Sequence, residues 1–190
     1  RAGGRTIYLN DTDQYAEPGV TYAVGRPALT VDGRVATLAV DEPYRERVET
    51  DYRVQVDTGG TARLDVELRF FGLRHAGYQR DMARQTPEER RRFGQETAAS
   101  ISQSARLLGE LEVQADRYPG VLRYQVEVPR FAVRDGDYLH FNLPAQMAVR
   151  LPALPNQRVN PWYSEDEVRV ITRNEVTLPA GELRLVPEDT

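Results

Sequence analysis

An aspartate-rich turn near the start of the chain has the residue types and spacing of a catalytic position. The hydrophobic segment Thr6 to Leu9 is typical of a strand, and it runs into Asn10-Asp11-Thr12-Asp13 before a Pro-Gly turn at 18–19. A carboxylate at a strand end can face a neighbouring histidine and orient it, which is the third position of a Cys-His-Asp site. Clustered aspartates also hydrogen-bond their own backbone, so turn formation is the alternative role for Asp11 and Asp13.

A second candidate site is the aromatic pair in Asn160-Pro161-Trp162-Tyr163-Ser164, which contains the single tryptophan of the chain. Exposed tryptophan and tyrosine side chains can stack against sugar rings or peptide side chains. A lone tryptophan in a β-rich protein can instead close the end of the hydrophobic core. Trp162 and Tyr163 are therefore candidate binding residues, with core packing as the alternative.

Other reactive side chains lack the partners that chemistry requires. His75 and His140 have no further histidine or acid at metal-ligand spacing, so we expect structural roles for both and no metal site. No serine lies in a Gly-x-Ser-x-Gly turn that would expose and activate its hydroxyl. This applies to Ser100, Ser102, Ser104 and Ser164.

The charged residues of the chain are expected to lie on solvated faces. All 25 basic residues are arginine, 29 residues are acidic and the net charge is −4, with no basic stripe of the kind that binds nucleic acid. The paired acids at 88–89 fit a helix start, the acids at 165–167 fit a solvated loop, and Arg90-Arg91-Arg92 point in different directions on a helix.

Composition excludes further chemistry within these residues. The chain has no cysteine, which rules out disulfides, thiolate metal sites and cysteine nucleophiles here. No stretch of about 18 apolar residues occurs, so we expect no membrane span. We expect no cofactor.

The chain is mostly strand-like. The range 26–40 alternates around Asp32-Gly33, which predicts a hairpin, and apolar and charged residues alternate over 52–56 and 62–70 around Gly59-Gly60, which predicts a second hairpin with one wet face. Further strands are predicted at 108–113, 121–128, 131–133, 138–143, 168–171, 176–178 and 183–186.

Two helices interrupt the strands. Thr86-Pro87-Glu88-Glu89 supplies an N-cap, a proline in the first turn and acids near the helix start, which predicts a helix over 87–101. A shorter helix is predicted at 78–84. The fold class is therefore mainly β, an antiparallel β-sandwich-like domain with a two-helix insertion at about 77–104.

The motif Asp11-Thr12-Asp13-Gln14-Tyr15 with Pro18-Gly19 resembles the closing motif of bacterial transglutaminase-like proteins that carry domains of unknown function around a papain-like core. Later positions resemble the C-terminal β-domain of such proteins, namely Gly72, Arg80, Arg158 with Pro161, and the strand end 176–181. The resemblance implies that Asp11 orients a catalytic histidine and that the cysteine and histidine of the triad lie upstream of Arg1.

The resemblance also predicts how the chain is organised. Residues 1–22 would be the last strand and turn of the catalytic core, and residues 23–190 a C-terminal β-domain, either shortened or incomplete at its C-terminus. Its partner would be the upstream catalytic domain of the same polypeptide, in a periplasmic or extracytoplasmic location. A cut domain would leave strand edges exposed, so a homodimer through those edges is a further expectation.

Two functions from different classes follow. The first is a non-catalytic accessory domain of a transglutaminase-like cysteine protease or amide-modifying enzyme, not an enzyme on its own. The second is an independent β-sandwich module that binds protein or carbohydrate partners through Trp162 and Tyr163.

Overall fold

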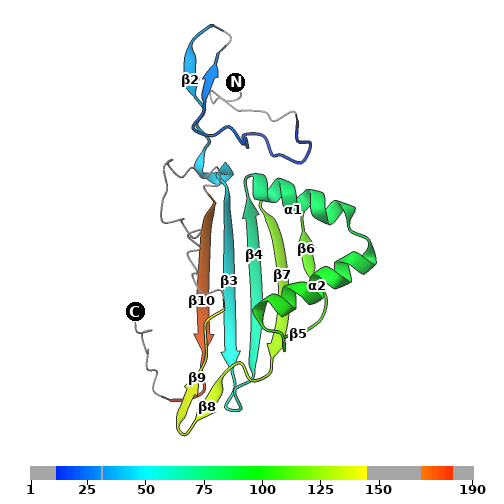
Figure 1. The fold of residues 1–190 in the computed structure, drawn as a ribbon, viewed down its shortest axis with the longest axis vertical. Helices are drawn as coiled ribbons and strands as arrows, with labels where there is room; N and C mark the ends of the chain where they lie inside the picture. The colour runs from blue at the N-terminus through cyan, green and yellow to red at the C-terminus, as the bar shows by residue number, and fades with distance from the viewer. Residues whose placement is uncertain (1–11, 31, 145–167, 182–190) are drawn as a thin grey trace, which may run out of the picture.

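The computed structural model describes residues 12–30, 32–144 and 168–181, and its centre is a six-stranded sheet (Figure 1). The strand order is β10-β3-β4-β7-β5, with β6 also paired to β7. The long strands are β3 (Arg47–Val56), β4 (Ala62–Phe71), β7 (Gly120–Val128) and β10 (Arg169–Thr177), and the short ones are β5 (Arg106–Leu107) and β6 (Glu112–Gln114).

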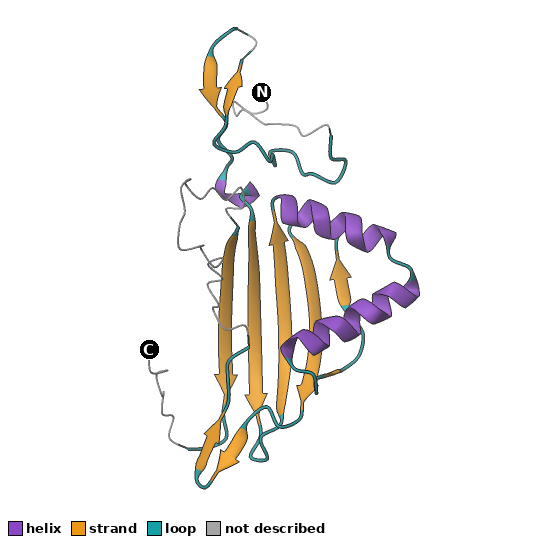
Figure 2. Cartoon of the chain, viewed as in Figure 1, coloured by secondary structure: helices purple, strands orange, loops and turns teal. Residues whose placement is uncertain are grey.

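The helices pack on one face of this sheet, so the described fold has two layers, a sheet and a helix pair (Figure 2). Helix α1 (Leu73–Arg84) follows β4, and α2 (Pro87–Ile101) follows α1. The mainly β fold with a two-helix insertion is therefore confirmed. Neither helix in the described residues has the length and apolar character needed to cross a bilayer.

The core lies between the sheet and the helices because the strands alternate with a period of two. Leu64, Leu122 and Val126 are at most 2% exposed and belong to the same core as Met82 and Ala98 of the helices. Burial of each leucine, valine or methionine side chain stabilises the fold by about 2 kcal/mol. The alternate residues of the same strands form the opposite, charged face.

Tyr78 ties α1 to the sheet. Its ring stacks on Phe70 at 4.4 Å between centroids, and its hydroxyl donates to the carbonyl of Val121 at 3.1 Å. Burial raises the pKa of Tyr78 to about 12, so the phenol keeps its donor proton across the physiological pH range.

Two small hairpins stand apart from the large sheet. Strands β1 (Pro27–Leu29) and β2 (Val35–Thr37) pair around the predicted Asp32-Gly33 turn, and β8 (Val133–Asp135) pairs with β9 (Tyr138–His140) at the opposite end of the molecule (Figure 1). A 3-10 helix, η1 (Glu42–Tyr44), leads from the first hairpin into β3. The hairpins predicted around Asp32-Gly33 and Gly59-Gly60 are both confirmed with shifted boundaries.

Helix α2 has the predicted bounds and a complete capping box. The Thr86 hydroxyl accepts from the Glu89 amide at 3.3 Å, and the Glu89 carboxylate accepts from the Thr86 amide at 2.8 Å. The acids at the helix start therefore serve its backbone, as the sequence predicts.

The strand predicted at 131–133 shares only Val133 with β8. Three further strand and helix boundaries were also predicted wrongly. Helix α1 begins at Leu73 instead of residue 78, because β4 ends at Phe71 and Gly72 turns the chain, so His75 lies in a helix and not at a strand end. The strand predicted at 108–113 is split into β5 and β6, because Gly109 has a positive φ of 86° that a strand residue does not adopt.

The third error concerns β10. The sequence predicts two strands at 168–171 and 176–178, but residues 169–177 form one strand that runs parallel to β3. Thr172 and Asn174 continue the alternation and no turn residue interrupts it. The predicted strands 6–9 and 183–186 lie outside the described residues.

Gly72 is expected to tolerate no side chain. Its backbone has φ 61° and ψ −139°, and a Cβ would lie 2.9 Å from the Glu46 Cα. Gly72→Ala should lower the free energy of unfolding by about 3 kcal/mol, measured by chemical denaturation. Gly77→Ala is the matched control, because a Cβ there meets nothing within 4 Å and should stabilise helix α1 by about 0.5–1 kcal/mol. Equal effects at both positions would contradict a special backbone requirement at Gly72.

Candidate functional site

The three residues predicted to form sites lie outside the described residues. They are Asp11, Trp162 and Tyr163. The roles of Asp11 as a histidine-orienting carboxylate and of the aromatic pair as a binding site therefore stay predictions. What the structure describes is the segment that directly follows Asp11.

An ion pair fixes this segment to helix α1. The Arg80 guanidinium donates to Asp13 Oδ2 at 2.6 Å and lies 5.7 Å from the centre of the Tyr15 ring. Asp13 Oδ1 also accepts from the Tyr15 amide at 3.1 Å, which is the turn hydrogen bond expected of a clustered aspartate. The hydrogen bond from Arg80 is the main reason that the pKa of Asp13 is lowered, so this pair stays charged at neutral pH. We call Asp13, Tyr15 and Arg80 the N-terminal clamp.

Apolar packing completes the attachment a few residues later. Val20 is 1% exposed, and a Cβ added at Gly19 would lie 3.2 Å from the ring of Tyr44, so the backbone there runs close to that ring. Burying a valine stabilises its segment by about 1.5 kcal/mol or more. The backbone from Asp13 to Val20 is therefore held at two points, by charge at one end and by packing at the other.

Tyr118 joins the elements at this end of the sheet. Its hydroxyl accepts from the Gly72 amide at 3.1 Å and donates to the carbonyl of Pro43 in η1. Its ring lies 5.7 Å from Tyr44 and 5.1 Å from His75, between ring centroids. The phenol therefore links η1, the end of β4 and the start of α1.

The two histidines have separate surroundings. His75 is fully buried, and its Nε2 donates to the carbonyl of Ala115 at 3.0 Å, while Nδ1 has no hydrogen-bond partner among the described residues. His140 is exposed and lies beside Tyr138 in β9, at the other end of the sheet from α1 (Figure 1). The structure does not bring them together.

The serines and arginines of the helical region make local contacts. The Ser102 and Ser104 hydroxyls lie 3.0 Å apart, and Ser104 donates to the carbonyl of Pro129. On α2, Arg91 pairs with Glu88, Arg92 pairs with Glu96, and Arg90 reaches the carbonyl of Met82. These arginines point in different directions, as predicted, and form no single patch.

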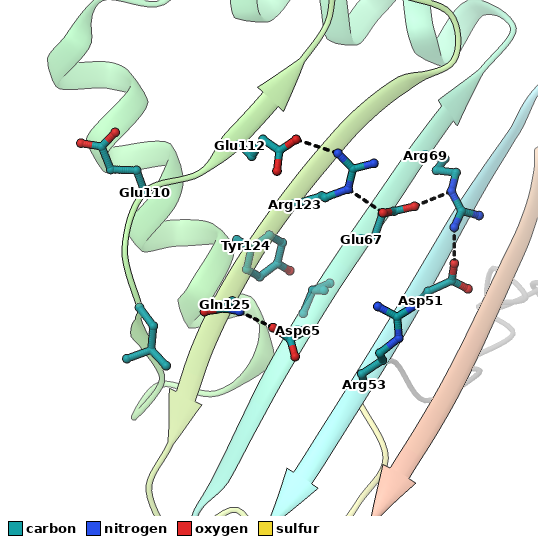
Figure 3. A pocket seen from close by; sticks show the side chains of 12 residues that line it. Asp51, Arg53, Asp65, Glu67, Arg69, Glu110, Glu112, Arg123, Tyr124 and Gln125 are labelled. Atoms are coloured by element: carbon teal, nitrogen blue, oxygen red, sulfur yellow. Dashed lines mark hydrogen bonds and ion pairs between the residues drawn. The ribbon is translucent and has the colours of Figure 1, made fainter.

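The most extensive polar arrangement in the described residues lies on the charged face of the sheet, opposite the helices (Figure 3). A hollow of about 530 Å³ opens there over β3, β4 and β7. A row of charged side chains in register crosses the sheet at the hollow: Arg173, Asp51, Glu67, Arg123 and Glu112.

Each end of this row is a conventional cross-strand ion pair. Arg173 Nη1 lies 3.1 Å from Asp51 Oδ1, and Arg123 bridges Glu67 at 2.6 Å and Glu112 at 2.7 Å. In the middle, however, Asp51 lies directly opposite Glu67, and like charges in that position destabilise a sheet.

Arg69 resolves this conflict from the neighbouring row. Its guanidinium donates to Asp51 and to Glu67 at 2.6 Å each and to Glu49 at 3.1 Å, so one cation serves three carboxylates. Its side chain is 30% exposed. We call these four residues the Arg69 cluster.

The arginines lower the pKa of all three carboxyls. For Glu67 the largest cause is the hydrogen bond from Arg123, with Arg69 adding to it. For Glu49 and Asp51, partial burial is the largest single influence and raises the pKa, but the hydrogen bonds and charges of the arginines together outweigh it.

This direction of shift has a chemical consequence. A general acid at neutral pH needs a raised carboxyl pKa, whereas these carboxylates are held ionised by arginine. Within the described residues, no group of three or more histidine, aspartate or glutamate side chains could hold a metal ion. The arrangement therefore favours a structural network with a polar hollow above it.

The sequence contains part of the signal for this network. Arg47 and Glu49 pair at 2.9 Å and Glu67 and Arg69 at 2.6 Å within single strands, two residues apart. The alternation by itself predicts only a wet face, because the cross-strand partners depend on a register that the sequence does not state.

No family model matches the chain, and the comparisons with curated proteins and with solved structures gave no match either.

Arg69→Met should lower the free energy of unfolding at pH 7 by about 2–3 kcal/mol, because three neighbouring carboxylates lose their shared cation. The folded pKa values are lowered, so this stabilisation is complete above the unfolded values of 4.5 for glutamate and 3.8 for aspartate and is lost as the pH falls through the folded values. Chemical denaturation at about pH 3, below both unfolded values, should therefore show a smaller difference than at pH 7.

The control is Arg63→Met on the same strand and face, where the side chain is exposed and makes no ion pair within the described residues. Its effect should stay within about 0.5 kcal/mol at both pH values. If Arg69→Met cost as much in acid as at neutral pH, the loss would come from packing and not from charge.

Proposed function

We propose that this chain is a non-catalytic accessory domain of a transglutaminase-like cysteine protease or amide-modifying enzyme, and that it flanks the catalytic domain in the same polypeptide. The proposal combines the resemblance of Asp11-Thr12-Asp13-Gln14-Tyr15 to the closing motif of such a core with one observation. The N-terminal clamp holds Asp13, two residues after Asp11, on helix α1 at 2.6 Å.

The clamp gives the accessory domain a mechanical role. A catalytic aspartate acts by holding a histidine in one tautomer and orientation, so its own backbone must be fixed. Arg80 and the buried Val20 fix the segment that follows Asp11 from the side of the β-domain. The domain would then support the orienting residue without contacting the reacting atoms.

The alternative is an independent module that binds protein or carbohydrate partners. The hollow of about 530 Å³ on the charged face is the observation that favours it, since ligand sites have volumes of that order. The side chains around the hollow are largely paired with each other, so the hollow favours a binding module less than the clamp favours an accessory role. Sequence encoded upstream of Arg1 separates the two functions.

The first test is to translate the reading frame upstream of the codon for Arg1. A cysteine at a helix start and a histidine on a following strand are expected there. In that full polypeptide, Asp11→Asn should slow alkylation of the cysteine by iodoacetamide at about pH 6 by about tenfold or more, because the imidazolium that stabilises the thiolate loses its carboxylate. Asp135→Asn at the exposed end of β8 is the control and should leave the rate unchanged.

A start codon directly before the codon for Arg1, or an unrelated domain upstream of it, would overturn the accessory role and leave the binding module. A reactive cysteine whose alkylation is indifferent to Asp11→Asn would overturn the role of Asp11 alone.

The clamp can be tested in the chain itself. Arg80→Ala should speed amide hydrogen exchange over residues 13–20 by about tenfold or more, while the core strands keep their protection, because only local contacts are lost. Arg84→Ala on the same helix, exposed and without an ion pair in the described residues, should leave these amides unchanged. Unchanged exchange in Arg80→Ala would mean that Val20 alone holds the segment. The N-terminal clamp would then no longer support the proposed accessory role.

A further inference from the structure

The β1–β2 hairpin is not expected to be stable when it is surrounded by water alone. It extends beyond the α1 end of the sheet (Figure 1), and its two strands have three residues each. Leu29 and Val35 lie directly opposite each other, share one face and are 76% and 74% exposed. A two-stranded hairpin alone is at best marginally stable, so this one needs a further strand or an apolar surface.

The β8–β9 hairpin shows the contrast. It also exposes apolar side chains, at Val133 and Tyr138. However, Leu139 and Phe141 pack against the core, and the Ala132 amide donates to the carbonyl of Gly60 at 2.9 Å. No residue of β1 or β2 belongs to the core of the described residues. Contacts within the domain therefore hold the β8–β9 hairpin despite its exposed side chains. The β1–β2 hairpin contributes no residue to that core.

The described residues at the tip of the first hairpin are joined by their own side-chain hydrogen bonds. The Thr30 hydroxyl donates to Asp32, and the Arg34 amide donates back to Thr30 at 3.1 Å. Arg34 Nε donates to Asp32 at 2.7 Å, and hydrogen bonds from Arg34 and Thr30 lower the pKa of Asp32. A preorganised tip reduces the entropy cost of binding.

The two outer edges of the hairpin differ in what they offer. The Thr30 amide bonds to the Arg34 carbonyl, so the next pair along, Leu29 with Val35, points its backbone groups outward, as does Pro27 with Thr37. Pro27 has no amide hydrogen, which weakens the β1 edge. The β2 edge presents the amides and carbonyls of both Val35 and Thr37.

We propose that the β1–β2 hairpin docks on the catalytic domain of the same polypeptide, with the β2 edge pairing to an exposed strand and Leu29 and Val35 covering an apolar patch. This inference rests on the function proposed above. The hairpin directly follows the clamped segment and leaves the sheet at the same end, so its contact surface continues the attachment made by Asp13 and Val20 (Figure 1).

The size of the hairpin selects a tethered partner over a second copy. A stable free dimer buries about 1,200 Å² or more in total, which two three-residue strands do not supply. A partner in the same chain is present at an effective concentration on the order of millimolar, so a small contact is sufficient. A tethered partner therefore fits this small surface better than a second copy does.

Hydrogen exchange compares the 190-residue chain with the full polypeptide. Peptides that cover 27–37 should exchange at least about tenfold more slowly in the full polypeptide, because the outward amides of Val35 and Thr37 gain partners. Peptides that cover β8–β9 should exchange equally in both. The double variant Leu29→Asp, Val35→Asp should abolish the added protection, whereas Val133→Asp should preserve it.

The outcomes separate this inference from the function on which it rests. A full polypeptide with the upstream cysteine and histidine, but with unprotected 27–37 peptides, overturns the docking and leaves the accessory role standing. An upstream region without a thiol enzyme removes the partner and overturns both. Protection that appears in the 190-residue chain itself and rises with its concentration identifies a second copy as the occupant and overturns the tethered partner.

Discussion

The register between β3 and β4 is the constraint on which the rest of the sheet depends. One side of these strands carries the buried Val54 and Leu64, and a slip by one residue would turn them to water and bring charges into the core. The core therefore fixes which residues face each other on the other side, and there Asp51 meets Glu67. The charged residues do not determine this register. Arg69 compensates for the repulsion between Asp51 and Glu67 that the register causes.

This order of cause explains why the charged face is organised as a network. An isolated surface ion pair contributes about 0–1 kcal/mol and would not offset the repulsion of clustered carboxylates. Arg69 is 30% exposed and contacts three of them at once, while Arg123 and Arg173 hold the outer members. The register that buries the apolar side brings carboxylates together on the other side of the sheet. Three arginines offset the resulting repulsion.

Much of the fold was predictable because it follows from local chemistry. Alternation predicted β4 and β7, and the capping residues around Thr86 predicted the start of α2. The start of α1 was not predictable, because it depends on Gly72 adopting a positive φ at a point where its backbone lies close to Glu46. The parallel pairing of β10 was missed for a similar reason, since a partner more than a hundred residues away leaves no trace in local sequence.

The candidate site divides in the same way. The turn hydrogen bond of Asp13 follows from the local sequence. Its ion pair with Arg80, in contrast, joins positions 67 residues apart and depends on where α1 begins. Since Gly72 and Tyr118 set the start of α1, they also set the position of Arg80, two turns further along the helix. The segment after Asp11 is therefore positioned by the same contacts that join the helices to the sheet. A displacement of α1 would therefore move the N-terminal segment through the Asp13–Arg80 ion pair, without a rearrangement of the core.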